Sequence, residues 1–286
     1  MKKSDKSKIV GKLSGESSNI YIAQGQGKGQ TSYPIYNKNS NNESSNYDHL
    51  PTIEELEGLK LNPEDICGSD ERANIQNTKI YPWSAICQLI ITRSDGSRAR
   101  ATGWFNGKGT VITAGHCVYS QDLNTWNKTI TVIPGKNGSE EPFGQVSSEN
   151  LWSVEGWTKD KDPNYDYGAI ILPTQLGNNT GYFGFGVFSD SILINTKVNL
   201  SGYPGDKPNT QWAMYEKIES VNARKVEYMI DTIPGHSGSP IWFDEQNGQH
   251  YAVGIHAYGG CPNSGTRINH EVFNNLMTWR ELGNQN

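Results

Sequence analysis

The feature that most restricts the fold of this chain is a series of short apolar, β-branched runs that begins at about residue 65. Residues 84–92 (SAICQLIIT) form one such run, and residues 102–117 (TGWFNGKGTVITAGHC) contain two runs joined by a glycine-rich turn. Residues 240–259 repeat this hairpin pattern, and residues 269–282 have helical spacing with Asn269 as the N-cap. Many strands followed by one helix predict an all-β barrel or sandwich rather than an α/β fold.

Residues 1 to about 62 have a different composition, rich in Gly, Asn, Ser, Gln and Lys and almost without aliphatic side chains. Such a segment cannot bury enough apolar surface to offset the entropy lost on ordering, so we expect a mostly disordered leader. Within it, residues 52–61 (TIEELEGLKL) predict one short helix. Thr52 is its expected N-cap, and Glu55 stands in the capping-box position.

The bulk numbers exclude some classes of partner. The 286 residues carry 25 basic and 30 acidic side chains, a formal charge of −5. This balance gives no electrostatic footprint for nucleic acid. No apolar run has the length of a membrane span, so we expect neither a nucleic-acid nor a membrane partner.

Four dispersed cysteines bear on metal binding and on the redox compartment. None of the pairs has C-x-x-C spacing, so we expect no metal and no cofactor. An even number suits two disulfides and an oxidising compartment, with buried free thiols as the alternative. The N-terminus is basic like a signal peptide but lacks its apolar region, which leaves the compartment open. The cysteines are Cys67, Cys87, Cys117 and Cys261.

The stretch 231–240 (DTIPGHSGSP) places His236 directly before Ser237. Neighbouring side chains of an extended chain point to opposite sides, so His236 is not the expected base for Ser237. His116 ends a β-branched strand among small residues, and Asp166 lies between tyrosines before another strand. A buried carboxylate there needs a partner. The alternative for each residue alone is a purely structural role.

The order of these residues separates two hydrolase classes. They run His116, Asp166, Ser237, whereas an α/β-hydrolase has the order Ser, Asp, His and a G-x-S-x-G elbow that leads into a helix. Here Ser239 replaces the second glycine, and Pro240 leads into a predicted strand. The α/β-hydrolase interpretation is therefore poor.

The motifs TAGHC, YDYGAI and GHSGSP, in this order, resemble the chymotrypsin-like serine proteases and more closely their V8-like branch, the bacterial glutamyl endopeptidases. Further matches are ICGSDER (66–72), TGWF (102–105) and SGYPGDK (201–207), so the resemblance covers about residues 65–286. It implies two six-stranded antiparallel β-barrels with a C-terminal α-helix. The expected division is a leader or pro-region at 1–64 and a protease domain at 65–286. Within that domain, the N-barrel spans about 76–175, the C-barrel about 183–268 and the helix about 269–282.

The resemblance also implies the activity, hydrolysis of peptide bonds through an acyl-enzyme. Ser237 is then the nucleophile, His116 the base, and Asp166 the residue that orients His116. The backbone N–H groups of Gly235 and Ser237 form the expected oxyanion hole. The implied protein is a secreted monomer that acts on polypeptides.

Two positions match the S1 pocket of glutamyl endopeptidases, Thr232 and His256, and a hydroxyl with an imidazolium suits a buried Glu or Asp at P1. Asp231 raises an alternative, because trypsin-like enzymes place an acid there to bind Arg or Lys. A second alternative is a non-catalytic binding module with the same fold. By resemblance, the chain is cut between Glu64 and Asp65, which makes residues 1–64 the pro-segment of a zymogen and leaves an α-amine near S1.

The sequence departs from the family around its cysteines and its oxyanion turn. Ala101 stands where several relatives have the partner of Cys117. Cys87 could replace that partner if the Cα atoms lie within about 7 Å, which would leave Cys67 to pair with Cys261. Pro234 and His236 replace the usual glycine and amide, and Ala257 replaces a serine that often hydrogen-bonds the triad Asp in animal enzymes.

Overall fold

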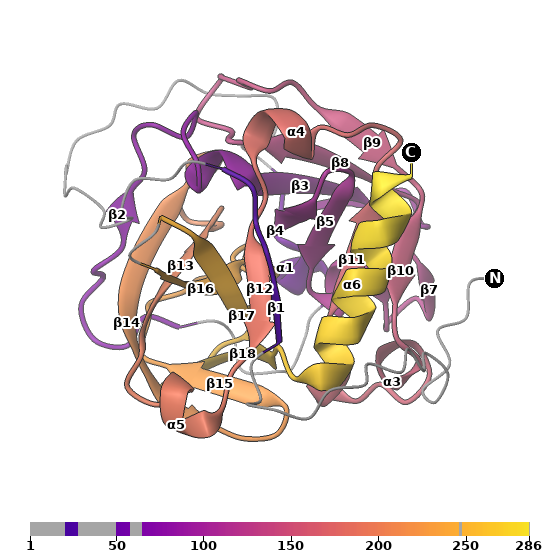
Figure 1. Ribbon diagram of the computed structural model, residues 1–286. Coiled ribbons are helices and arrows are strands. Elements are labelled where there is room, and N and C mark those ends of the chain that lie inside the picture. Colours follow the sequence, from indigo (N-terminus) through magenta and orange to yellow (C-terminus); the bar gives the residue numbers. More distant parts are fainter. Residues whose placement is uncertain (1–20, 28–49, 58–64, 246–247, 286) are drawn as a thin grey trace.

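The computed structural model describes residues 21–27, 50–57, 65–245 and 248–285, arranged as two large β-sheets, a small two-stranded sheet and a long C-terminal helix (Figure 1). The first sheet is antiparallel and has seven described strands in the order β10-β11-β5-β4-β3-β8-β9. Their bounds are β3 (Ile86–Thr92), β4 (Arg98–Gly107), β5 (Thr110–Thr113), β8 (Thr129–Pro134), β9 (Val146–Ser148), β10 (Leu151–Ser153) and β11 (Gly168–Ile171).

The second sheet closes on itself, because β17 pairs with both β16 and β18 and so completes the ring β17-β16-β13-β14-β15-β18. β2 (Ala73–Asn74) pairs antiparallel with β14, and β12 (Gly184–Val187) pairs in parallel with β17. The barrel strands are β13 (Lys197–Gly202), β14 (Trp212–Val221), β15 (Lys225–Tyr228), β16 (Pro240–Asp244), β17 (His250–Tyr258) and β18 (Asn263–Arg267).

The remaining elements are short, apart from the last helix. They are 3₁₀ helices η1 (Trp83–Ala85) and η2 (Pro163–Tyr165), helices α2 (Gly115–Val118), α3 (Glu155–Thr158), α4 (Gly177–Thr180) and α5 (Asp190–Leu193), and strands β6 (Tyr119–Ser120) and β7 (Thr125–Trp126). Helix α6 (His270–Asn284) begins where the sequence predicts, with the Asn269 side chain accepting from the Val272 N–H at 3.0 Å. α6 packs on β4, β5 and β11 and buries Leu276 and Trp279 there.

The predicted chymotrypsin-like all-β class is therefore confirmed, with one difference in the first sheet. The second sheet is a six-stranded barrel, whereas the first is a half-barrel of seven described strands. Its edge strands β9 and β10 are joined directly by Glu149 and Asn150. The chain thus connects the two edges, and no ladder between them is formed among the described residues.

Two parts of the leader are structured, which differs from the disorder predicted for it. β1 (Tyr21–Ala23) pairs with β12, and α1 (Ile53–Glu57) packs beside β4. The predicted capping box is confirmed: the Thr52 N–H donates to Glu55 Oε2 at 2.7 Å, and the Glu55 N–H donates to Thr52 Oγ1 at 3.3 Å. Ile53 is fully buried, so a few apolar side chains hold these parts in place. Residues 58–64, including Glu64, lie outside the described residues.

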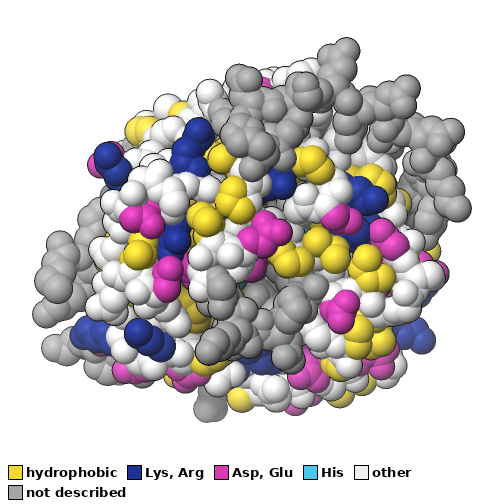
Figure 2. Space-filling model, turned by 180° about the vertical axis from the view of Figure 1, so that it is seen from behind, with side chains coloured by type: hydrophobic (Ala, Val, Ile, Leu, Met, Phe, Trp, Pro, Cys, Tyr) yellow, Lys and Arg dark blue, Asp and Glu magenta, His cyan; other side chains and the backbone are white. Residues whose placement is uncertain are grey.

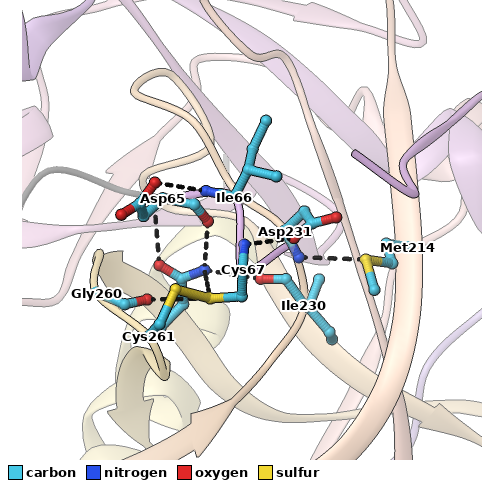
Figure 3. The surroundings of a disulfide bond; sticks show 9 residues. Asp65, Ile66, Cys67, Met214, Ile230, Asp231, Gly260 and Cys261 are labelled. Atoms are coloured by element: carbon cyan, nitrogen blue, oxygen red, sulfur yellow. Dashed lines mark hydrogen bonds between the residues drawn. A yellow bond between two sulfur atoms is a disulfide. The ribbon is translucent and has the colours of Figure 1, made fainter. Parts of the chain in front are cut away.

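The cysteines form one of the two proposed disulfides. Cys67 and Cys261 are bonded, with Cα atoms 5.7 Å apart (Figure 3). The proposed Cys87–Cys117 bond is wrong, since both are free, buried thiols. β4 lies between β3, which carries Cys87, and β5, which leads to Cys117. Two strand spacings of about 4.8 Å exceed the separation of about 7 Å that a disulfide can bridge.

The described surface carries charges of both signs. On the face in Figure 2, basic, acidic and hydrophobic side chains are interspersed. Within the described residues, no helix is long and apolar enough to cross a membrane.

The two large sheets meet closely at Gly238, so a substitution of this glycine tests how they pack. Its φ of +90° is left-handed, and an added Cβ would overlap the Thr102 carbonyl oxygen and the Thr113 hydroxyl. Gly96 is a matched control, because its φ is +87° and nothing lies within 4 Å of an added Cβ. We expect Gly96→Ala to lower the free energy of unfolding by about 1–2 kcal/mol, and Gly238→Ala to lower it by about 2 kcal/mol more. Equal losses in denaturant titrations would contradict this packing.

Candidate active site

The predicted site residues meet where the two sheets join. His116 lies in α2 directly after β5, Asp166 lies between η2 and β11, and Ser237 lies in the turn before β16. All three are fully buried. Thr102 of β4 holds the turn in place, because its N–H donates to the Ser237 carbonyl at 3.0 Å and its hydroxyl donates to the Gly235 carbonyl at 2.8 Å.

A carboxylate–imidazole pair forms the centre of the site. Asp166 Oδ2 lies 2.8 Å from His116 Nδ1, and Asp166 Oδ1 accepts from the His116 backbone N–H at 2.9 Å. Gly115 leaves room for this contact, since a Cβ there would lie 2.9 Å from Asp166 Oδ1. Burial would lower the pKa of His116, but the adjacent charge of Asp166 outweighs it and raises that pKa well above its usual range.

Tyr258 and Lys225 lie behind Asp166 and were missed by the sequence analysis. The Tyr258 hydroxyl donates to Asp166 Oδ2. Burial would raise the pKa of Asp166, but the charge of His116 and the hydrogen bonds from His116 and Tyr258 lower it. Lys225 Nζ lies 4.1 Å from the centre of the Tyr258 ring, and burial lowers the pKa of this lysine to about 8. The one available signal was the neighbouring Ala257, which replaces a serine that often hydrogen-bonds this Asp and so left room for another hydroxyl donor.

The turn that carries Ser237 needs glycine. Gly235 has a φ of +107°, and a Cβ there would lie 2.6 Å from the Tyr203 carbonyl oxygen. His236 Nδ1 lies 3.0 Å from the Ile233 carbonyl oxygen, within the same turn. Burial and the positive charge of Arg72 hold the pKa of His236 well below its usual range, so this ring is neutral. His236 thus braces the turn.

The two predicted pocket residues lie on either side of that turn. His256 is fastened to it by backbone bonds, from Gly238 N–H to the His256 carbonyl at 2.8 Å and from His256 N–H to the Ser239 carbonyl at 2.9 Å. Its Nδ1 contacts the Tyr228 hydroxyl. Thr232 is fully buried, and its hydroxyl makes no hydrogen bond to the described residues.

The Asp231 carboxylate binds the backbone of residues 67 and 71. Oδ1 accepts from the backbone N–H of Cys67 at 2.8 Å (Figure 3). Oδ2 accepts from the backbone N–H of Glu71 at 2.9 Å. Asp65 is held nearby. Its carbonyl accepts from the Thr232 N–H at 3.2 Å and from Asn263 Nδ2 at 2.8 Å, and its N–H donates to Asn263 Oδ1 at 3.2 Å. The Asn263 contacts were also missed, since they join residues far apart in the sequence.

Helix α1 brings two further carboxylates to the site. Glu54 Oε1 lies 3.8 Å from His116 Nε2, an ion-pair distance longer than a hydrogen bond. Burial would raise the pKa of Glu54, but the nearby side chains of His116 and Ser237 lower it. Glu57 Oε1 lies 3.8 Å from Arg93. The disorder predicted for the leader hid both residues, although the capping box marked the helix that carries them.

Comparisons with known proteins agree with this geometry. The sequence matches the trypsin family over residues 72–279. It is 42% identical to a glutamyl endopeptidase of Bacillus licheniformis, over 75% of this chain and 69% of that protein. A solved structure of a Glu endopeptidase in complex with MPD has a TM-score of 0.67 and 28% identity, and covers 76% of this chain and 99% of that one. The resemblance inferred from the motifs is therefore confirmed.

Another relative carries a different name. A Bacillus subtilis (strain 168) protein called extracellular metalloprotease is 41% identical, over 77% of this chain and 71% of its own length. In the described part of this chain, no three His, Cys, Asp or Glu side chains gather where they could hold a metal ion.

Glu57 gives a prediction on pH. Burial raises its pKa from 4.5 to about 7, although His116 and Arg93 oppose the shift and Asp122 adds to it. The folded chain therefore keeps a proton that the unfolded chain loses. This contribution to stability is full below pH 4.5 and is lost as the pH rises through about 7. We expect Glu57→Gln to remove this loss, on the order of 3 kcal/mol in the free energy of unfolding. A gap between variant and parent that stays constant across this pH range would refute the assignment.

Proposed function

The chain belongs to the trypsin family and is a serine endopeptidase, and from this premise we propose that it cleaves polypeptides after glutamate through an acyl-enzyme on Ser237. The observation that carries the proposal is the bond of 2.8 Å between His116 Nδ1 and Asp166 Oδ2. It fixes the tautomer in which Nε2 can accept a proton. Ser237 is close to this pair, since its carbonyl oxygen lies 3.9 Å from Sγ of Cys117, the residue after His116.

The proposed chemistry follows from these contacts. Ser237 Oγ attacks the scissile carbonyl carbon while His116 Nε2 takes its proton, and the carbonyl π electrons move to the oxygen. Asp166 stabilises the imidazolium. His116 then gives the proton to the leaving amine as the C–N bond breaks, and water repeats the sequence to release the acid. The N–H groups of Gly235 and Ser237 bind the oxyanion, and losing one such donor costs about 10²–10³ in rate.

The specificity is proposed from three side chains. Thr232 and His256 offer a hydroxyl and an imidazole to the carboxylate of a P1 glutamate. Asp231, the residue that favoured cleavage after Arg or Lys, already accepts two backbone N–H groups. Its charge is therefore engaged away from the pocket, which supports glutamate over the basic alternative. The glutamyl endopeptidase relatives support the same choice.

We further propose that the protein is a secreted, monomeric zymogen with residues 1–64 as its pro-segment. Cleavage between Glu64 and Asp65 would free an α-amine at the position where Asn263 Oδ1 now accepts from the Asp65 N–H at 3.2 Å. This charge would lie beside Thr232 and favour an anionic P1 side chain. The Cys67–Cys261 bond suits an oxidising compartment, and the B. subtilis relative is named extracellular.

Peptide reporters with Glu, Asp, Arg or Leu at P1 test this function on the processed protein. We expect the Glu reporter to exceed the Arg reporter in kcat/KM by about 10² or more, because a charge mismatch in a buried pocket costs several kcal/mol. Ser237→Ala should remove almost all turnover and leave a residual rate only about 10³ times that of the reaction in water. Faster cleavage of the Arg reporter would reject the glutamate assignment. No cleavage of any reporter would favour the alternative of a non-catalytic binding module.

Tyr258→Phe tests the contact behind Asp166. Without the hydroxyl, more of the Asp166 charge acts on His116, so the pKa of His116 rises and the acid limb of kcat/KM moves to higher pH. We also expect kcat to fall by about tenfold or more, the effect of one hydrogen bond to a charged group. Tyr119→Phe is the control, because among the described residues its hydroxyl donates to Asn124 Oδ1 and not to Asp166. An unmoved acid limb in Tyr258→Phe would show that the contact is structural only.

A further inference from the structure

The Glu54 carboxylate is buried beside His116, the base of the proposed reaction. A buried carboxylate is costly without a partner, and the ion-pair partner of Glu54 is His116 Nε2 at 3.8 Å. The Ser237 side chain also lowers the pKa of Glu54. His116 therefore has Asp166 on Nδ1 and Glu54 facing Nε2. Two carboxylates around one imidazole favour its protonated form, in which both nitrogens are donors. A protonated His116 cannot take a proton from Ser237.

The segment Leu50–Glu57 is seated by specific contacts around this carboxylate. The Arg100 N–H donates to the Pro51 carbonyl at 3.0 Å, so the segment lies along β4. Thr52 and Ile53 are fully buried, and Thr52 packs against Gly205, which belongs to the second half of the molecule. The segment therefore contacts both halves next to the site.

What the segment presents to Ser237 is not a cleavable bond. The group of this segment that faces His116 Nε2 at 3.8 Å is a side-chain carboxylate on a helix. The Thr52 carbonyl is engaged by the Leu56 N–H at 3.2 Å, and the capping box fixes the first turn. The last four carbonyls of a helix have no intrahelical partner, so these bonds hold only the start of the segment, and what faces His116 is the Glu54 side chain.

We propose that the surface over His116 and Ser237 binds a short acidic helix, that this helix is the segment Leu50–Glu57 of the same chain, and that its Glu54 carboxylate shuts the site. The proposal rests on the proposed function, since it takes His116 and Ser237 as the reacting pair. It goes beyond that function because it gives a cause for the inactivity of the uncut chain, the Glu54 carboxylate inserted at the site. Any effect of the uncut N-terminus on the pocket is separate from this one. The segment also acts in trans after cleavage, as an inhibitor with the sequence LPTIEELE.

The first test uses the full chain, kept intact by Glu64→Gln and verified by mass spectrometry. The readout is the rate at which a small fluorophosphonate labels Ser237. We expect Glu54→Gln to raise this rate by about tenfold or more, the value of one charge-assisted contact. Glu55→Gln is the matched control on the same helix, because Gln keeps the capping box, and we expect a change below about twofold.

The second test adds the peptide LPTIEELE, with blocked ends, to the processed protein, and mass spectrometry checks that its glutamyl bonds stay intact. An eight-residue helix is marginal in water, so we expect weak, competitive inhibition that weakens about tenfold or more with Glu54→Gln in the peptide. Calorimetric binding of the same two peptides to processed Ser237→Ala protein reads the contact without any turnover.

The outcomes separate this proposal from the proposed function. If the processed protein cleaves the Glu reporter while Glu54→Gln labels like the intact parent and the peptides bind alike, the inhibitory role of Glu54 is wrong and the function stands. If no reporter is cleaved but peptide binding still depends on Glu54, the binding surface stands and the function falls. An intact parent that labels as fast as the processed protein would overturn the inhibition outright.

Discussion

The site is organised around one buried carboxylate. Asp166 lies with no exposure to solvent, where an unpaired charge would be strongly unfavourable. Its partners are the backbone N–H and the ring Nδ1 of His116, together with the hydroxyl of Tyr258. These groups come from α2 in the first half and from β17 in the second, so satisfying Asp166 requires the two halves to be docked. The same contacts fix the orientation of the His116 ring.

The leader and the start of the protease domain contribute to the site from opposite directions. On one side, Glu54 faces the outer nitrogen of His116. On the other, Asp65 is held beside Thr232 by Asn263, next to the disulfide between Cys67 and Cys261. A single cut between these two points would release the first contact and leave the second in place. Under the proposed processing, the chemistry and the specificity of this chain would both depend on whether one short stretch is cut.

Much of the fold and site could be predicted from local patterns. Strand runs, turn glycines and the Asn269 cap are short-range signals, and Thr52 with Glu55 predicted a real helix start. The sequence failed where the deciding contact is long-range. Tyr258 and Asp166 are 92 residues apart, and Cys87 is separated from Cys117 by a strand whose place in the sheet the sequence does not reveal. Average composition also hid the order of α1, because one fully buried isoleucine anchors it.

The most direct test of the central claim is the Asp166→Asn variant of the processed protein. The amide cannot accept from His116 Nδ1 as the carboxylate does, so the ring loses the tautomer with a free Nε2 and the charge that stabilises its protonated form. With the Glu reporter we expect kcat to fall by about 10⁴ while KM changes little. A kcat within about tenfold of the parent would contradict the account, since the buried pair would then not carry the reaction.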